Sequence, residues 1–288
     1  MFVVTGASGK LGRAIVHQLA QRVPVGRLVA VSRNPAALAD LAALGVDVRQ
    51  GDFADPPSLA SAFKGTKHLL LISSNAKAYG GDSLGQHRVA LAAARDAGIE
   101  RVVYTSHMAV SHDSAFPPMH EHAATEDMLR ASGLSWTALR NGFYGSSGLA
   151  MLAEGMRTGA FDTAADGPVS WAAHADLAEA AARVLIDTSR ESGPTSPLTG
   201  PEALDLSDLA SIASSLMGKP VVRCTHPVDA LRARLEEKGL PPTIVAISLG
   251  FYEAARQGEF STVDPALERL LGRPPIRMRD LIAQQLGS

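Results

Sequence analysis

The first half of the chain alternates between short apolar segments and longer amphipathic ones. The apolar segments are rich in β-branched residues and apolar along their whole length, as expected for parallel strands covered on both faces. They predict strands over residues 2–5, 28–32, 46–50, 68–74, 101–106 and 135–140. The amphipathic segments predict helices over residues 10–22, 35–44, 57–64, 83–98 and 119–132. Right-handed crossovers between such strands give a Rossmann-like, doubly wound parallel α/β sheet.

Turn residues stand where this alternation needs them. Gly45 and Gly98 each lie between a predicted helix and the next strand, where a left-handed cap ends a helix. Asn34 precedes Pro35, an order typical of an N-cap followed by the first helical residue.

Helical patterns dominate the second half, with short Pro- and Gly-rich segments between them. The predicted helices cover residues 147–157, 174–188, 207–217, 227–238, 242–256 and 276–286. We therefore expect two units, a sheet domain over 1–145 and a smaller, mainly helical substrate lobe over 146–288. Some segments of the lobe are expected to return to the first domain. The cleft between the two units is the default ligand site.

The charge balance narrows the possible partners. The chain of 288 residues has 27 basic and 29 acidic side chains and a formal net charge of −2. This balance provides no cationic field for nucleic acid or for an anionic membrane. No apolar run approaches the roughly 20 residues of a membrane span. The single cysteine, Cys224, excludes an internal disulfide, so we expect a cytoplasmic protein.

A glycine-rich loop follows the first predicted strand directly. Its sequence T-G-A-S-G-K-L-G would permit a tight turn, a close approach of backbone to a pyrophosphate, and packing of the next helix on the sheet. The N-terminus of that helix would offer free N–H groups to the phosphates. The loop therefore predicts that 1–145 is an NAD(P)-binding domain. The predicted contacts in the loop are Thr5, Gly6, Ser8, Gly9, Lys10, Leu11 and Gly12.

The end of the second predicted strand favours NADPH over NADH. An NAD-binding fold places a carboxylate there for the ribose 2′-hydroxyl, but this strand ends in V-S-R-N. Arg33 stands where a 2′-phosphate would arrive, and a guanidinium suits that dianion. Lys10 would add a second positive charge nearby.

Polar residues at the ends of other strands extend the predicted cofactor site. Asp52 and Phe53 would bracket the adenine at the end of the third strand. Each of these positions has the alternative role of a residue that caps a turn. Further candidates are Ser73 and Ser74 after the fourth strand and Thr105 and Ser106 after the fifth.

These motifs resemble the NmrA-like group of atypical short-chain dehydrogenases, and most closely its quinone-reductase and triphenylmethane-reductase branches. The more specific matches are H-A-A-T-E at 122–126 and L-R-N-G-F-Y at 139–144. The resemblance covers residues 1–145, and segments at 174–185 and 218–221 extend it. It implies NADPH as cofactor, with the nicotinamide near Thr105–Ser106 and Asn141–Tyr144, so that Asn141 and Phe143 join the predicted contacts. It also implies a homodimer.

The proton relay of ordinary short-chain dehydrogenases is missing from this sequence. That relay pairs a tyrosine with a lysine four residues later, and none of the four tyrosines here has such a lysine. With Glu126 aligned to the glutamate that often follows the motif, Pro118 takes the tyrosine position and His122 the lysine position. The acceptor is then one that needs little acid catalysis, such as a quinone or a cationic dye.

Three aromatic residues and one histidine are the candidates for acceptor chemistry. His122 would donate a proton or orient the nicotinamide ribose, since the usual pKa range of histidine suits the first role. Tyr144 is the second candidate catalytic residue. Phe143 and Tyr144 would stack on a flat acceptor, with ordinary packing as the alternative, and Trp171 would line the cleft.

Two functions stay open at this point. The first is an NADPH-dependent reductase that transfers hydride to a quinone or a similar flat conjugated acceptor. The second is a non-catalytic NADP(H)-sensing regulator that binds a protein partner. No metal site is expected, because His120 and His122 at i, i+2 point to different sides of a helix.

Overall fold

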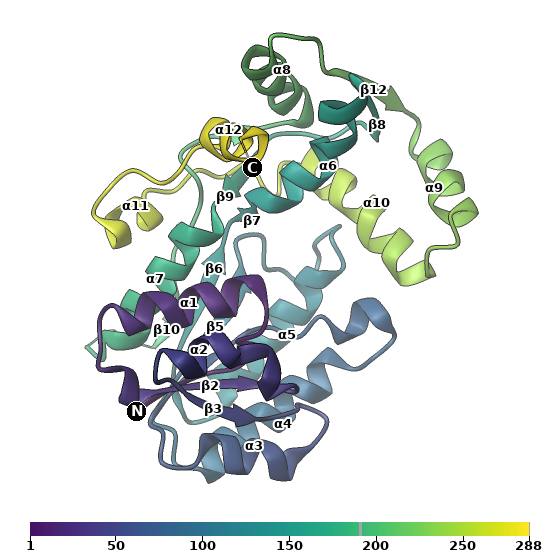
Figure 1. The fold of residues 1–288 in the computed structure, drawn as a ribbon. Helices are drawn as coiled ribbons and strands as arrows, with labels where there is room; N and C mark the ends of the chain where they lie inside the picture. The colour runs from purple at the N-terminus through teal and green to yellow at the C-terminus, as the bar shows by residue number, and fades with distance from the viewer. Residues whose placement is uncertain (190–191, 288) are drawn as a thin grey trace.

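A parallel seven-stranded sheet forms the centre of the first domain (Figure 1). This computed structural model describes residues 1–189 and 192–287. The strand order is β10-β6-β5-β4-β1-β2-β3, which confirms the predicted Rossmann-like sheet. The order reverses between β1 and β4, and open α/β sheets bind ligands beyond the carboxyl ends of their strands at such a point. The strands are β1 Phe2–Val4, β2 Leu28–Ser32, β3 Asp47–Gln50, β4 His68–Leu71, β5 Arg101–His107, β6 Ser135–Asn141 and β10 Gly193–Pro194.

Helices cover both faces of this sheet. Neighbouring strand residues enter opposite cores: Val4 packs with the helices of one face, and Val3 with those of the other. This burial of both faces is why the strands are apolar throughout. One face carries α1 Lys10–Ala20, α2 Ala39–Ala43, α7 His174–Ile186 and α11 Ala266–Leu271. The other carries α3 Pro56–Phe63, α4 Ser83–Asp96 and α5 Pro118–Ala131.

Short 3-10 helices and glycine caps complete the turns of the first domain. Asn34 caps the second of these 3-10 helices by accepting the N–H of Ala36 at 3.2 Å, as predicted. Gly45 and Gly98 take the predicted left-handed conformation, with φ of +88° and +72°. The 3-10 helices are η1 Val25–Arg27, η2 Pro35–Leu38 and η3 Ala76–Tyr79.

The second lobe has its own core and contains two small sheets that the sequence did not predict. One sheet has the order β11-β9-β7, and the other pairs β12 with β8. Cys224 lies in β12. The strands are β7 Phe143–Tyr144, β8 Ala160–Ala164, β9 Val169–Ala172, β11 Ala203–Leu204 and β12 Val222–His226. The helices are α6 Gly145–Thr158, α8 Leu206–Met217, α9 Val228–Glu237, α10 Pro242–Arg256 and α12 Met278–Leu286.

The two parts of the chain are interwoven. The helices α7 and α11 lie after residue 145 but belong to the core of the sheet domain. Strand β10 also returns to the sheet and extends its β6 edge, where Pro194 needs no N–H. The exact division at residue 145 stays a prediction.

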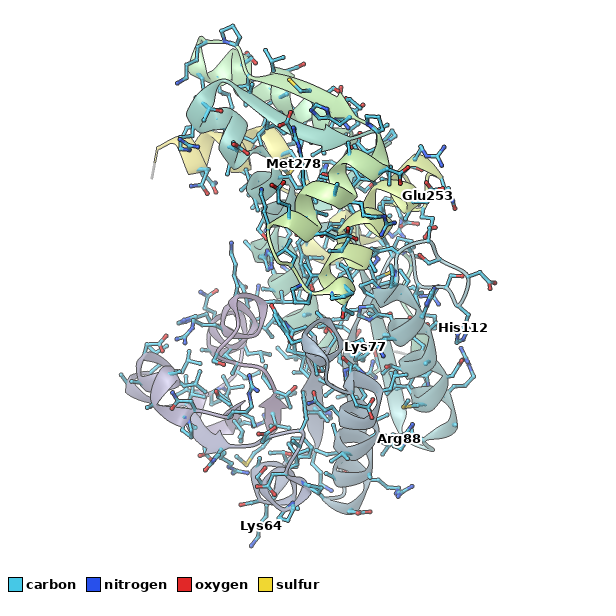
Figure 2. All side chains as sticks on the ribbon, turned by 90° about the vertical axis from the view of Figure 1, so that its right-hand side faces the viewer. Lys64, Lys77, Arg88, His112, Glu253 and Met278 are labelled. Carbon is cyan, nitrogen blue, oxygen red and sulfur yellow. The ribbon has the colours of Figure 1, made fainter. Side chains whose placement is uncertain are left out.

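Helix α10 joins the second lobe to the loops at the carboxyl end of the sheet. It contacts η3 after β4, and it packs so closely on the loop before α5 that a Cβ at Gly250 would lie 2.7 Å from the Ala115 carbonyl oxygen. Figure 2 shows this lobe, with Glu253 and Met278, at the opposite end of the molecule from Lys64.

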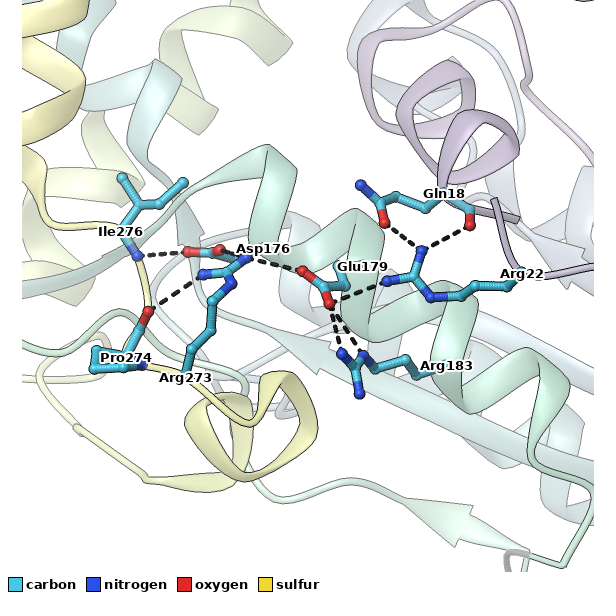
Figure 3. Close-up of polar contacts among 8 residues, drawn as sticks. All are labelled: Gln18, Arg22, Asp176, Glu179, Arg183, Arg273, Pro274 and Ile276. Carbon is cyan, nitrogen blue, oxygen red and sulfur yellow. Dashed lines mark hydrogen bonds and ion pairs between the residues drawn. The ribbon is translucent and has the colours of Figure 1, made fainter. Parts of the chain in front are cut away.

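A cluster of charged side chains ties the C-terminal segment to α7 (Figure 3). Asp176 is completely buried, accepts the N–H of Ile276 at 2.6 Å and pairs with Arg273 at 2.8 Å. Its neighbour Glu179 lies one turn further along the helix and also pairs with several cations. These are the guanidinium groups of Arg22, Arg183 and Arg273.

Candidate functional site

The glycine loop lies between β1 and α1 at the switch point of the sheet. Gly6 has a φ of +59°, a backbone conformation that would be strained in a residue with a side chain. A Cβ at Gly12 would lie 2.3 Å from the Gly6 carbonyl oxygen, so the third glycine lets α1 press against the loop. Gly9 is the N-cap of α1, and within the described chain no side chain caps this helix. Its first N–H groups are therefore available to an anionic ligand.

The other loop residues divide into interior and surface positions. Thr5 is buried and joins β1 to β4, because its Oγ1 accepts the N–H of Ile72 at 3.0 Å. Leu11 packs into the core beside the sheet. Ser8 and Lys10 are exposed beside the free end of α1. The loop thus offers a ligand its backbone and these two side chains, while Thr5 and Leu11 hold its shape.

Arg33 follows β2 and is exposed next to this loop. Across the residues that the structure describes, its guanidinium makes no hydrogen bond or ion pair. Ser32, which precedes it, instead donates its hydroxyl to Ser8 Oγ at 3.2 Å. An unpaired cation beside an uncapped helix end fits a phosphate group.

Asp52 and Phe53 follow β3, and Asp52 takes the alternative, turn-capping role that the sequence allowed. Asp52 Oδ1 accepts the N–H of Ala54 at 2.9 Å and so closes a turn. Phe53 is half-buried against the core beneath the sheet. Both side chains are partly exposed to solvent, and their contact with an adenine stays a prediction.

The ends of β4 and β5 are joined through Ser73, Ser74 and Thr105. The N–H of Ser73 donates to Thr105 Oγ1 at 2.8 Å. The N–H of Ser74 donates to His87 Nε2 at 2.8 Å, so the proton of the neutral His87 ring lies on Nδ1, 2.8 Å from Thr125 Oγ1. His87 is not predictable from the sequence, because a lone histidine in a helical pattern carries no signal of its partners.

Ser106 is turned into the interior and away from the edge of the sheet. Its hydroxyl donates to Glu126 Oε1 at 2.6 Å. Glu126 is 3% exposed and also pairs with Arg140 at 2.8 Å. Ser106 thus completes a buried ion pair between β6 and α5, and its predicted contact with the cofactor has no support from this position.

Asn141, at the carboxyl end of β6, carries an unsatisfied polar atom. Its side chain is 2% exposed, and Oδ1 has no hydrogen-bond partner in the parts of the chain that are described. A buried acceptor without a donor is costly, so this position fits a ligand that brings one, such as a carboxamide or a ribose hydroxyl. Asn141 lies opposite His107 of β5 in the register of the sheet.

The three predicted acceptor-binding aromatics face different surroundings. Phe143 and Tyr144 are neighbours in β7 and so point to opposite sides. Phe143 packs within the second lobe, whereas the ring of Tyr144 packs at a tilt against His174 with centroids 4.5 Å apart. Trp171 is 1% exposed and donates its indole N–H to the Leu204 carbonyl oxygen at 2.9 Å. The predicted contact of Trp171 with substrate stays a prediction, and the near-complete burial of the side chain does not support it.

His122 lies on α5 and contacts Tyr104 of β5. The His122 Nδ1 atom is 2.9 Å from the Tyr104 hydroxyl. Burial raises the pKa of Tyr104, so the phenol keeps its proton, and burial lowers the pKa of His122 to about 4. At neutral pH the His122 ring is therefore uncharged. An imidazolium proton donor at this position, as the sequence suggested, does not fit that environment.

His107 is the last residue of β5, one residue beyond the predicted strand. Its ring lies 6.2 Å from that of His122, centroid to centroid. Burial, aided by His122, lowers the pKa of His107 to about 3. The loop that follows lines a surface pocket of about 360 Å³ together with Glu259, through Met108, Ala109, Val110, Ser111, Asp113 and Ser114.

The described residues contain no group of three or more histidine, cysteine, aspartate or glutamate side chains that could hold a metal ion. His120 Nε2 bonds to the Ser114 carbonyl oxygen at 2.8 Å, on a different side of α5 from His122. Of the helices described, none is both long and apolar enough to cross a membrane.

Comparison with known proteins gives matches along nearly the whole chain. The profile of a family described as NAD(P)H-binding matches residues 6–188. The chain is 35% identical over 284 residues to quinone oxidoreductase 2 of Escherichia coli strain K12, covering 98% of each protein.

Solved structures give the same likeness. An NADPH-dependent quinone oxidoreductase from Escherichia coli, complexed with NADPH, has a TM-score of 0.92 at 34% identity over 99% of this chain and 100% of that one. The triphenylmethane reductase of Citrobacter sp., complexed with NADP(H), has a TM-score of 0.88 at 32% identity over 99% of each chain. The second lobe is therefore included in the likeness.

Proposed function

This chain belongs to the NAD(P)H-binding family, and we propose on that basis that it is an NADPH-dependent reductase. It transfers hydride to a quinone or a similar flat conjugated acceptor without a Tyr–Lys proton relay. The observation that carries the proposal is the end-to-end likeness to a quinone oxidoreductase, combined with a free cation at the glycine loop. The resemblance to the NmrA-like reductases, read from the sequence motifs, is confirmed by the same likeness.

The choice of NADPH rests on the charges around the loop. Arg33 and Lys10 are both exposed beside the uncapped N-terminus of α1, and together they would hold the two phosphate regions of the cofactor. When bound, NADPH supplies the hydride and the two electrons that reduce the acceptor. Asn141 would take a donor group of the nicotinamide end through its unpartnered Oδ1.

The absence of a relay is supported by the surroundings of the tyrosines near this edge. Tyr104 is enclosed in the core and held by His122, and burial raises the pKa of Tyr144 although the amide group of Asn141 acts in the opposite direction. Among the described residues, no lysine is one of the groups that shift the pKa of either phenol. A quinone suits such a site, because hydride addition gives an anion that aromatisation stabilises without a proton from the enzyme.

The test is NADPH oxidation, followed by the loss of reduced-nicotinamide absorbance, with a panel of benzoquinones and naphthoquinones. We expect turnover above the uncatalysed rate and a preference for NADPH over NADH. No turnover with any quinone would refute the proposal. Tight NADP(H) binding without turnover would instead favour the NADP(H)-sensing regulator.

The proposal also includes a small-molecule acceptor as the partner, a homodimer and a cytoplasmic location. Size-exclusion chromatography with light scattering tests the homodimer. A mass of one chain at micromolar concentration would contradict it.

A further inference from the structure

The tautomer of His107 is set by its own loop. His107 Nδ1 accepts the backbone N–H of Ala109, with 3.2 Å between the two nitrogen atoms. A backbone amide can only donate, so Nδ1 cannot carry the proton of a neutral ring. Since the low pKa keeps the ring neutral at physiological pH, its proton lies on Nε2. Within the described residues, Nε2 has no hydrogen-bond partner.

The position of this free N–H matches the place where an acceptor would lie. His107 ends β5 at the carboxyl edge, opposite Asn141. Its ring meets Phe143 edge to face at 5.5 Å and also contacts Phe116 and Phe260. The ring is therefore held by apolar neighbours that compete for no hydrogen bond. Ala109, which sets the tautomer, also lines the surface pocket of about 360 Å³ that the following loop forms with Glu259.

We propose that His107 is a catalytic residue whose Nε2–H donates a hydrogen bond to the acceptor oxygen that becomes negatively charged during hydride transfer. This inference rests on the proposed quinone reductase function. The quinone gains a hydride and becomes a hydroquinone anion, while the reduced nicotinamide is oxidised. The final proton comes from water, because a neutral imidazole N–H is too weak an acid to give its proton to a phenolate. The histidine thus stabilises charge and stays neutral.

The neighbouring His122 has a different role in this arrangement. Its Nδ1 is engaged with Tyr104, 18 residues away in sequence, and this contact anchors the ring beside His107. The two rings are close enough that a positive charge on one disfavours a charge on the other, which helps to keep His107 neutral.

The test compares His107→Phe with His107→Gln and with a matched control. Phenylalanine keeps the aromatic packing but removes the N–H donor, so kcat with a benzoquinone should fall by about 10- to 100-fold. The KM for NADPH should stay within about twofold, and glutamine, which retains an N–H donor, should recover part of kcat. The control is His112→Phe, because His112 is exposed on the same loop and pairs with Asp127 at the surface. It should leave kcat unchanged.

A second measurement separates this inference from the proposed function. The binding of para-nitrophenolate to the NADP⁺ complex, followed by its visible absorption, mimics the anionic product without turnover. His107→Phe should weaken this binding about tenfold, and His112→Phe should not change it. If the wild type turns over no quinone, the proposed function fails, and the binding test still decides the role of His107. A His107→Phe protein that keeps wild-type kcat or wild-type phenolate affinity would overturn the inference.

Discussion

Replacement of Arg273 by methionine tests whether the ion pairs of Figure 3 hold the C-terminal segment on α7. The Arg273 guanidinium lies 2.8 Å from Asp176, whose side chain is 0% exposed. Removing one partner of a buried pair costs about 3–5 kcal/mol of unfolding free energy, because the other charge loses its counterion. Arg273 itself is 43% exposed, so water can reach its place, and Ile276 N–H still donates to Asp176. We therefore expect a loss of roughly 2 kcal/mol.

The assay is equilibrium unfolding in urea at neutral pH, followed by far-UV circular dichroism. Arg256→Met is the control, because Arg256 pairs with Glu253 on an exposed helix surface and should contribute nothing measurable. Asp176→Asn and the double variant Arg273→Met/Asp176→Asn complete a double-mutant cycle. The double variant should lose about 1 kcal/mol less unfolding free energy than the two single variants lose together. A midpoint for Arg273→Met equal to that of Arg256→Met, or strict additivity in the cycle, would refute the reasoning.

Three further predictions concern the cofactor site and its buried histidines. Gly12→Ala should weaken NADPH binding and lower the unfolding free energy by about 1–3 kcal/mol, because the alanine Cβ would meet the Gly6 carbonyl oxygen. Titration followed by nicotinamide fluorescence measures the affinity, and an unchanged affinity would show that the loop does not form the site. Arg33→Ala should weaken NADPH binding by about 10- to 100-fold and leave NADH binding unchanged, and an equal effect on both cofactors would contradict the assignment. Burial lowers the pKa of His87 from 6.5 to about 4, so the unfolded chain binds this proton first as the pH falls. This proton alone should then lower the unfolding free energy by up to about 1.4 kcal/mol per pH unit across this window, in addition to the contributions of the other buried histidines, so His87→Gln should make the total drop shallower.

The long strands and helices of residues 1–141 were predictable because each carries a strong local signal. Strand β2, for example, lies where the β-branched run L-V-A-V-S stands, and α1 begins at the residue predicted from the glycine loop. The small strands of the second lobe carry no such signal. Strands β7 and β11 have two residues each, too few for any period, and they form only because β9 lies between them.

The residues at the strand ends show why a candidate site is harder to predict than a fold. Thr105 and Ser106 were both predicted as cofactor contacts because both are polar and end a strand. Consecutive side chains of a strand, however, point to opposite faces of the sheet. Ser106 lies on the same face of the strand as Tyr104, and both side chains contact α5. Ser106 bonds to Glu126 there, and Tyr104 contacts His122. The polar groups that meet Tyr104 and Ser106 are set by how α5 packs on the sheet, and the local sequence of β5 does not encode that packing.

The predicted end of β5 at residue 106 also placed His107 in a loop, whereas the strand continues through it. That single residue changes the chemistry assigned to the site. As a loop residue, His107 would be one of several mobile histidines with an ordinary pKa. As the last residue of the strand, it is held opposite Asn141, enclosed by aromatic rings and limited by Ala109 to one tautomer. A ring held in this way offers a directed N–H without a charge, which suits an acceptor that gains negative charge and needs no proton from the protein during hydride transfer.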